Sequence, residues 1–579
     1  MAVFLMLILL AEADSTDVDT LKTYEVPEIV SFYDGVYIIG ETVPAYYEQS
    51  ITDMLSRFPI ARYSCGEGIS TVATRGRKPS YTYVYLNGRR QLTDPTGYFN
   101  LAQLPLHFFD RLSYGHSLTG AGLSCYNFES KLNRYDKPYS YARFMFGSFQ
   151  SNIYEMDLTR AITDELGLYL SGSYYKTGGY RENADGQQLS LYSHIYYNRF
   201  LPLRLDIFYY ENDYGFPGST LTAVQGRHED EFLDINGMFA QGNSTVNIFY
   251  NVKNMYYIDS LNDRSVVSEI KRLGCDVEYH HDLLGATLDY GVAGYFTSVD
   301  GDVTSYKDYP LDLWVRLNKS IHRFALLASG YVGIAGDHET FYFPRLEVGY
   351  DIVEPVRIYG ALSKDARVPS DLESNAVFDT LNPYACIGGN SDLVPEYCWA
   401  EEIGVRSSFF SVAFYRFEFD DFITVAMEST NQYVYVNLDS WRINGCEGYF
   451  NIPLFLHHPD TSVTTKIVIG GNGNFLLSGD SIIYTPQYHG GARLSIIRET
   501  SRFSFGITVR GELYGRQLDK SGEEVSGFSV VSLAGLVKFM SLSCIARLDN
   551  VFDKKYAYVP HYPMASRNFD FSIKWEFWD

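Results

Sequence analysis

The sequence predicts an all-β transmembrane barrel closed around a small N-terminal α/β domain. Three observations predict this fold. Stretches in which apolar and polar residues alternate recur along most of the chain, and aromatic residues make up 16% of it. Beyond the first residues, no run reaches the ~18 apolar residues that a spanning helix needs. Alternation with period two indicates strands whose two faces meet different surroundings. A barrel with lipid outside and a polar lumen accommodates all of them, and its closure pairs every backbone group.

A soluble β-sandwich is the alternative reading of any single strand. The chain has 579 residues, and one soluble core does not grow to the size that so many strands would need. The net charge of −23 argues against a nucleic-acid partner, whose phosphates it would repel. The composition therefore favours the barrel.

The first residues have the pattern of an export signal. An apolar run, Val3 to Leu10, is followed by small residues at Ala11 and Ala13, which predicts a signal peptide over residues 1–13. An exported chain without a spanning helix is either soluble outside the inner membrane or a β-barrel.

The next part of the chain differs from the rest. Residues 31–134 are less regular and contain more turn residues, and 50–59 has a helical apolar face with Ser50 or Thr52 as its cap. We therefore expect a small domain over 31–134, preceded by a periplasmic segment at 14–30.

Residues 137–579 are expected to form the barrel, because the alternation recurs there. It is clear at 203–212, 413–420, 503–513 and 569–577. In each stretch we expect the polar face to line the lumen and the apolar face to meet lipid. The last strand must pair with the first, near 139–149, to remove the open edges of the sheet.

Several stretches resemble the plug of TonB-dependent outer-membrane receptors. They are "DMLSRFPIARYSCGEG", "ISTVATRGR", "YVYLNGRRQL" and "FNLAQLPLHFFDRLSYGHSLTGAG". Their plug positions are Pro59, Arg75, Gly76, Asn87, Gly88, Pro105 and Gly115. The barrel stretches "GGNSDLVPEYCWAEEIGVR" and "ARLDNVFDKKYAYVPHYPMASRNFDFSIKWEFWD" follow in the order usual for the family. The plug departs from the family pattern in two places. The stretch "LSYGHSLTG" lacks the usual Arg and Pro, and "SCYNFES" replaces the Gly-Gly-x-Ile-Asn stretch by which the chain usually leaves the plug.

The resemblance implies 22 antiparallel strands around the plug, in the outer membrane of a double-membraned bacterium. Such receptors bind a scarce solute too large for porins and release it inward when a TonB-type inner-membrane protein pulls on the plug. The segment "DTLKTYEV" resembles a TonB box, the extended peptide that the TonB-type protein would bind by strand addition. Its coupling residues are Asp19, Thr20, Leu21, Lys22 and Thr23. A disordered leader is the alternative for this segment.

The resemblance also bears on the cargo. The plug layout is most like that of the cobalamin receptor, and a ferric siderophore is the next candidate. Aromatic residues at the outward apices of the plug suit either ligand, and these are Tyr63, Tyr98 and Phe99. Haem receptors of this family usually carry a His in the loop that corresponds to 370–390. Haem is disfavoured because this chain has no His there. His107 and His116 are read as ordinary polar residues, with haem ligation as the alternative.

The terminal strand resembles the recognition strand by which outer-membrane barrels are inserted, which adds lipid and the barrel-assembly machinery as partners. Its outward residues are Phe571, Ile573, Trp575 and Phe577.

Other functions find less support. No Cys/His cluster predicts a structural metal, no cofactor is expected, and the acidic run 228–231 is read as solvated loop charge rather than as a Ca²⁺ site. An enzyme would need a constellation such as GxSxG or HExxH, and neither motif occurs. A passive porin or adhesin barrel would leave the N-terminal domain unexplained.

Overall fold

The structure is a computed structural model. It describes residues 35–38, 48–66, 68–115, 124–131, 138–199, 202–220, 223–260, 264–334, 340–353, 355–375, 387–429, 432–458, 463–479, 482–500, 502–519 and 521–578. The predicted signal peptide, the TonB-box residues 19–23 and His116 lie outside these residues.

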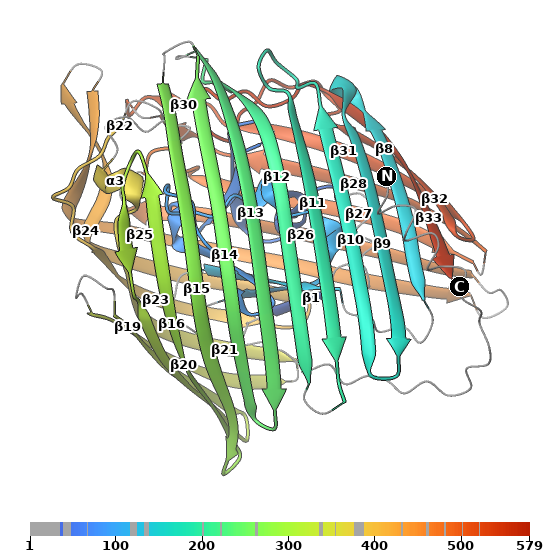
Figure 1. Ribbon diagram of the computed structural model, residues 1–579. Coiled ribbons are helices and arrows are strands. Elements are labelled where there is room, and N and C mark those ends of the chain that lie inside the picture. Colours follow the sequence, from blue (N-terminus) through green and yellow to red (C-terminus); the bar gives the residue numbers. More distant parts are fainter. Residues whose placement is uncertain are drawn as a thin grey trace.

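Twenty-two long strands form one closed antiparallel barrel, as predicted (Figure 1). In chain order they are β8 (Tyr139–Gly147), β9 (Asn152–Thr163), β10 (Leu166–Thr177), β11 (Gly186–Tyr197), β12 (Leu203–Gly218), β13 (Ala223–Gln241), β14 (Ser244–Asp259), β15 (Arg264–Leu283), β16 (Ala286–Gly301), β18 (Leu311–Ile321), β19 (Phe324–Ile334), β20 (Thr340–Val353), β21 (Val356–Arg367), β23 (Glu396–Arg406), β24 (Phe410–Ser429), β25 (Gln432–His458), β26 (Val463–Gly479), β27 (Tyr488–Glu499), β28 (Phe503–Tyr514), β31 (Phe528–Phe539), β32 (Leu542–Asp549) and β33 (Asn568–Trp578).

The first and last strands close the sheet. β33 pairs with β8 over nine residue pairs, from Asp570↔Gly147 to Trp578↔Tyr139, which confirms the expected pairing. On β33, Phe569 and Trp575 are exposed on the outer surface, whereas Asp570 and Ser572 are buried. The terminal strand therefore has the two faces that its alternation predicts.

The two ends of the barrel differ in their connections. One end carries tight turns, such as 242–243 and 284–285, and the other carries long connections, such as 515–527 and 550–567. Transmembrane barrels have short periplasmic turns and longer extracellular loops, so the short-turn end, at the bottom of Figure 1, is the periplasmic one. The loops and connections also hold η5 (Ser148–Gln150), β17 (Tyr306–Asp308), α3 (Asp371–Asn375), β22 (Ile387–Gly388), β29 (Gln517–Leu518) and β30 (Glu524–Val525).

An apolar belt covers the outer surface. On β28, Phe503, Phe505, Ile507 and Val509 are 38–46% exposed, because they point away from the plug. This confirms the expected orientation for 503–513.

The orientation expected for 413–420 is wrong. Tyr415, Phe417 and Phe419 are buried in the lumen, whereas Arg416 and Glu418 form an ion pair on the outer face with more than 40% of each side chain exposed. β24 has 20 residues, about twice the ~10 that a spanning strand needs. The stretch 413–420 lies in its lower half, next to the short turn at 407–409. There Tyr415, Phe417 and Phe419 pack with Tyr81 of the plug, so a plug surface takes the apolar face that lipid takes elsewhere.

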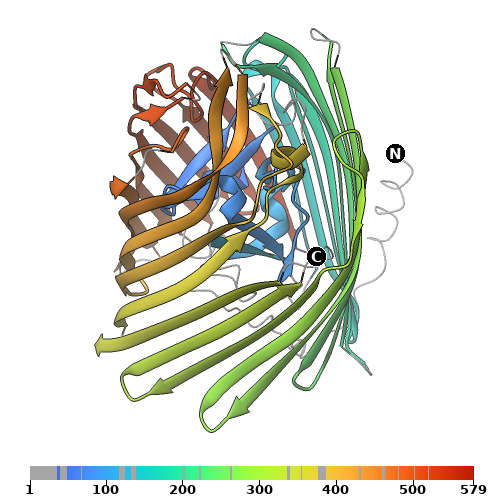
Figure 2. The same cartoon turned by 90° about the vertical axis from the view of Figure 1, so that its left-hand side faces the viewer.

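The plug fills the lumen, and Figure 2 shows its blue ribbons between the two walls of the barrel. Its main sheet is five-stranded in the order β1-β6-β7-β4-β5, and β2 and β3 form a separate hairpin. The elements are β1 (Gly35–Ile38), α2 (Ile51–Leu55), β2 (Ile60–Ser64), β3 (Ser70–Thr74), η2 (Pro79–Tyr81), β4 (Thr82–Leu86), β5 (Arg89–Arg90), η3 (Leu101–Gln103), η4 (Leu106–Phe108), β6 (Phe109–Gly115) and β7 (Ser124–Ser130).

Local chemistry explains where these elements begin and end. The hydroxyl of Ser50 accepts a hydrogen bond from the Asp53 backbone N–H and caps α2. This helix is shorter than the pattern at 50–59 predicts, since Pro59 disfavours helical backbone at the residue before it. Asn87 and Gly88 both have positive φ (52° and 83°), which is the conformation that an Asn-Gly turn supplies at the end of β4.

The described residues include no helix that is long and apolar enough to cross a membrane.

The acidic run 228–231 was expected in a loop, and this expectation is wrong. It lies within β13, so alternation separates its members. His228 and Asp230 are buried in the lumen, while Glu229 and Glu231 point outward.

The position of the apolar belt in the membrane can be tested by placing a charge at two heights on β28. Ile507→Lys places a charge near the middle of β28 and should destabilise the barrel by ~2–4 kcal/mol, whereas Leu513→Lys, also outward but near the extracellular end, should cost at most ~1 kcal/mol. Denaturant titration in lipid vesicles measures both values. Equal effects would contradict the assigned belt.

Candidate functional site: the plug–barrel interface

Arg75 joins the plug to one side of the barrel. It lies in the turn after β3, and its guanidinium donates to Glu402 of β23 and to Glu447 of β25, each at 2.6 Å. All three side chains are at most 8% exposed. Both Arg75 and Gly76 have positive φ, which turns the chain so that the guanidinium points at the wall. Two barrel carboxylates therefore hold one plug cation in a dry site.

A second cluster of charges surrounds Asp53 on α2. Its carboxylate contacts Arg62 of the plug at 2.7 Å, Arg547 of β32 at 2.9 Å and Arg510 of β28 at 3.5 Å. Burial by itself would raise the pKa of the Asp53 carboxyl, but these three arginines hold it well below its usual range. One plug carboxylate thus binds two barrel strands.

Arg62 extends this cluster towards the extracellular side. It contacts Glu512 of β28 at 3.6 Å, and its guanidinium lies over the ring of Tyr558. The Tyr558 hydroxyl donates to Glu512 at 2.7 Å. The charge cluster therefore continues to the loop between β32 and β33.

The loops form an aromatic roof over the plug hairpin, and we use "aromatic roof" for its members Tyr484, Tyr514, Phe528, Tyr556, Tyr558 and Tyr562. The roof crosses the lumen, because Tyr562 stacks on Phe216 of β12 and the carbonyl of His561 accepts from the Thr220 N–H. The connection 550–567 thereby reaches β12 across the top of the plug hairpin.

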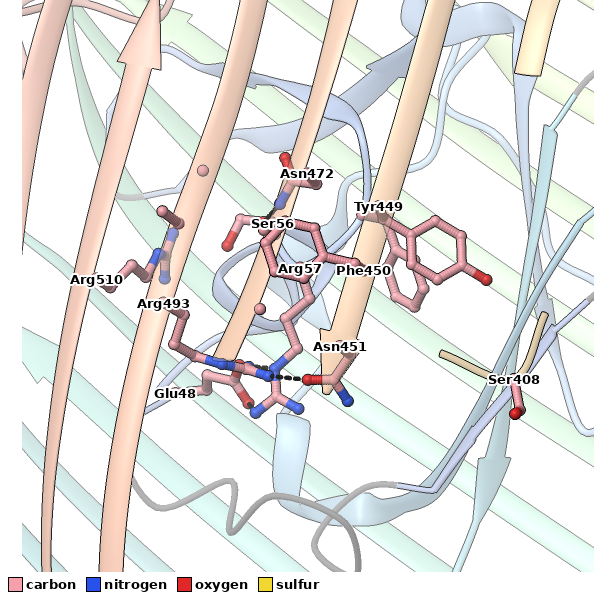
Figure 3. Close-up of a pocket in the computed structure, with 15 residues that line it drawn as sticks. Glu48, Ser56, Arg57, Ser408, Tyr449, Phe450, Asn451, Asn472, Arg493 and Arg510 are labelled. Carbon is pink, nitrogen blue, oxygen red and sulfur yellow. Dashed lines mark hydrogen bonds and ion pairs between the residues drawn. The ribbon is translucent and has the colours of Figure 1, made fainter. Parts of the chain in front are cut away.

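A polar cavity of about 110 Å³ lies lower, between α2 and the wall formed by β25 to β28 (Figure 3). Glu48 accepts from Arg57 at 2.6 Å and lies 4.0 Å from Arg493. Arg493 donates to Asn451 at 3.0 Å, and the Asn472 amide donates to the Ser56 carbonyl at 2.7 Å. The cavity is lined by plug and barrel residues together.

The predicted plug positions lie where the chain changes direction. Pro59 separates α2 from β2, and Pro105 precedes η4. Gly115 ends β6, and its carbonyl accepts from the Cys125 thiol. Their structural role stays a prediction.

The predicted ligand aromatics are not gathered in one site. Tyr63 is buried and donates to the Tyr484 carbonyl at 2.8 Å. Phe99 is only 4% exposed within the plug core, and Tyr98 is half-buried. Of the three, only Tyr63 packs with the residues under the roof, and the binding role of all three stays a prediction.

Apart from Arg75, the sequence did not point to the residues that hold the plug. The interactions of Asp53, Glu402, Glu447, Arg510 and Arg547 join positions about 330 to 490 residues apart, and no local pattern marks such pairs. His107 was read as an ordinary polar residue, and it lies 3.6 Å from Glu155 and 3.8 Å from Asp157.

Comparison with known proteins identifies the family. The family model described as "TonB dependent receptor-like, beta-barrel" matches residues 47–543, which is most of the chain. The protein belongs to the TonB-dependent receptor family, as its motifs predict. Its relatives are receptors and transporters rather than enzymes, and the family implies an outer-membrane location and coupling to TonB. No curated protein matches the chain.

Solved structures share the fold at low identity. The ferric enterobactin receptor PfeA has a TM-score of 0.74 and 15% identity, covering 94% of this chain and 99% of that one. The siderophore receptor PirA from Acinetobacter baumannii gives 0.73 and 14%, with 94% and 98% covered. The copper transporter OprC gives 0.73 and 16%, with 94% and 97% covered. At such identities the likeness shows the fold alone.

Arg75 provides a test of the interface. Arg75→Gln leaves Glu402 and Glu447 buried without their cation, so the protein should lose ~3–5 kcal/mol of stability, and its conductance in planar bilayers should rise. The matched control, Arg416→Gln, removes an exposed pair and should cost less than ~1 kcal/mol. Unchanged stability in Arg75→Gln would refute the anchoring role.

Asp53 provides a test by pH. Because its pKa is depressed in the folded protein, its stabilisation is complete above the unfolded value of ~3.9 and is lost as pH falls through the folded value. Asp53→Asn should therefore lower the thermal midpoint strongly at pH 7, and the difference should shrink below about pH 4. Asp351→Asn, which removes a partly exposed pair with Arg357, is the control. A difference independent of pH down to 2 would contradict this assignment.

Proposed function

We propose that this protein imports a ferric siderophore across the outer membrane of a double-membraned bacterium, with energy supplied through TonB. Cobalamin is the second candidate cargo. The observation that carries the proposal is a folded plug that closes the lumen and is held there by ion pairs. A passive porin would have no use for such a plug.

The interface suits a plug that must move. Its anchors at Arg75 and Asp53 are ion pairs and hydrogen bonds, which can exchange partners with water when they separate. Because no ATP is present at the outer membrane, the force must reach the plug through its N-terminal segment. We assign coupling to the TonB-box residues Asp19 to Thr23, which would add as a strand to a periplasmic partner.

The aromatic cluster above the plug hairpin suits a large ligand with flat or ring-shaped groups. The aromatic roof offers stacking faces and hydroxyls, which bind amphipathic surfaces well. Two of the similar structures are siderophore receptors by name, and this supports the iron complex. The stretch around Leu104 and Pro105, which resembles the cobalamin receptor, keeps cobalamin as the alternative.

We further propose that the barrel-assembly machinery recognises the terminal strand of the chain. Phe571, Ile573, Trp575 and Phe577 alternate with polar residues there, and this strand completes the barrel against β8. The lipid of the outer membrane then surrounds the apolar belt.

A deletion strain separates the two cargoes. Without the receptor, growth should fail on limiting iron supplied as ferric enterobactin, and a plasmid copy should restore it. Leu21→Pro should bind the complex normally but fail to restore growth, because proline interrupts strand addition.

Ser15→Pro, outside the box, is the matched control and should restore growth. Dependence on limiting cobalamin instead of iron would select the second cargo. Full growth with Leu21→Pro would refute the assigned coupling segment.

A further inference from the structure

The plug does not contact all sides of the barrel in the same way. Its apolar core is continuous with the wall formed by β10 to β16. Plug residues such as Leu101, Phe108 and Phe128 pack in one cluster with barrel residues Tyr169, Tyr192, Phe208, Phe232 and Ile270. Separating these surfaces would expose a large apolar area to water, which is unfavourable. This wall and the plug behave as one packed body.

The opposite wall, from β25 to β28, meets the segment from Glu48 to Phe58 mostly through polar groups, although Phe58 also packs edge-on against Tyr449 of β25. The residues that line the cavity from this wall are Tyr449, Phe450, Asn451, Gly470, Gly471, Asn472, Gly491, Ala492, Arg493 and Arg510. Three of these ten are glycines, so the wall carries little side-chain bulk at those positions. A Cβ placed on Gly491 would lie 3.7 Å from the Ser56 carbonyl oxygen, an ordinary contact distance, so a small side chain fits between the two surfaces. Polar groups that part here are re-solvated by water.

The plug side of the cavity is closed by Glu48. In the chain it lies between β1 and α2, so force applied to the N-terminal segment reaches Glu48 before it reaches α2. Glu48 binds Arg57 of the plug and lies beside Arg493 of the wall. Withdrawing Glu48 would therefore break the first of the contacts between the plug and this wall, and the pair of Asp53 on α2 with Arg510 of β28 would have to separate next.

We propose that the cargo passes along this wall. When the N-terminal segment is pulled, Glu48 leaves Arg57 and Arg493, and Ser56 leaves Asn472. Asp53 then leaves Arg510 of β28, and the cavity widens into a passage between α2 and β25 to β28. The apolar half of the plug stays on β10 to β16. A cavity of about 110 Å³ holds only a few waters, so the passage exists only in the pulled state. This proposal rests on the proposed function and adds the route to it.

Two matched tethers test the route. On this wall, the Asn472 amide donates to the Ser56 carbonyl (2.7 Å); on the opposite wall, the Gln188 amide donates to the Gln103 carbonyl (3.2 Å). Cysteine pairs at 56/472 (Ser56→Cys with Asn472→Cys) and at 103/188 (Gln103→Cys with Gln188→Cys) are bridged with a short bis-methanethiosulfonate, which reductant cleaves. Uptake and binding of radiolabelled ferric enterobactin and cyanocobalamin are then measured, with the treated natural chain as the control.

The 56/472 tether should lower TonB-dependent uptake at least tenfold, leave binding within twofold, and be reversed by reductant. The 103/188 tether should leave uptake within twofold. Normal uptake with the 56/472 tether overturns the route, and so does an equal block by both tethers, which would show that the plug moves as one body.

A second measurement does not depend on tethering. Gly491→Cys should react faster with a membrane-impermeant maleimide when TonB and cargo are both present, while Gln188→Cys should not. An unchanged rate at position 491 overturns the route. If the untethered chain takes up neither probe in a TonB-dependent manner, the proposed function itself fails, and the route falls with it.

Discussion

The ion pairs between plug and barrel are the interaction on which the arrangement depends. A buried ion pair adds little net stability, because both charges lose their water, whereas removing one partner costs several kcal/mol. Arg75 between Glu402 and Glu447 therefore fixes where the plug sits more than how firmly the protein folds. Asp53, held by arginines of β28 and β32, does the same on the adjacent side. Such contacts are specific and can also be separated.

The apolar contact between the plug core and the wall from β10 to β16 limits how the plug can move. Because the plug core and the wall from β10 to β16 form one cluster, their separation would be opposed by the hydrophobic effect over its whole area. The wall from β25 to β28 opposes separation less, because its contacts with the segment from Glu48 to Phe58 are mostly polar, with Phe58 on Tyr449 as an apolar contact. An asymmetric interface of this kind allows one part of the plug to yield while another part keeps its place.

The barrel could be predicted from the sequence because alternation is a local signal. The stretch 503–513 has its apolar side chains on the outer face, as expected, and the terminal strand pairs with β8. The prediction was wrong at 413–420, where Tyr415 and Phe417 point inward. Alternation shows that the two faces of a strand differ, but not which face meets lipid, because the plug also offers an apolar surface on the inner side.

The interface itself could not be predicted, for a physical reason. Arg75 was found because Arg75-Gly76 resembles the Arg-Gly turn of the family's plug, and the structure gives both residues positive φ. Its partners Glu402 and Glu447 are single carboxylates in long strands, where many carboxylates occur. Only the register of the closed barrel selects these two. The same holds for Arg510 and Arg547 around Asp53.

The charge cluster and the aromatic roof meet at one residue. Arg62 contacts Asp53 on α2 and Glu512 on the wall, and it lies under the ring of Tyr558. Tyr558 in turn donates to Glu512. A ligand that displaces Tyr558 from the aromatic roof removes one hydrogen bond from Glu512 and a ring face from Arg62. In a dry site such a change is felt strongly by the neighbouring charges, so events at the outer surface alter the electrostatics that hold α2.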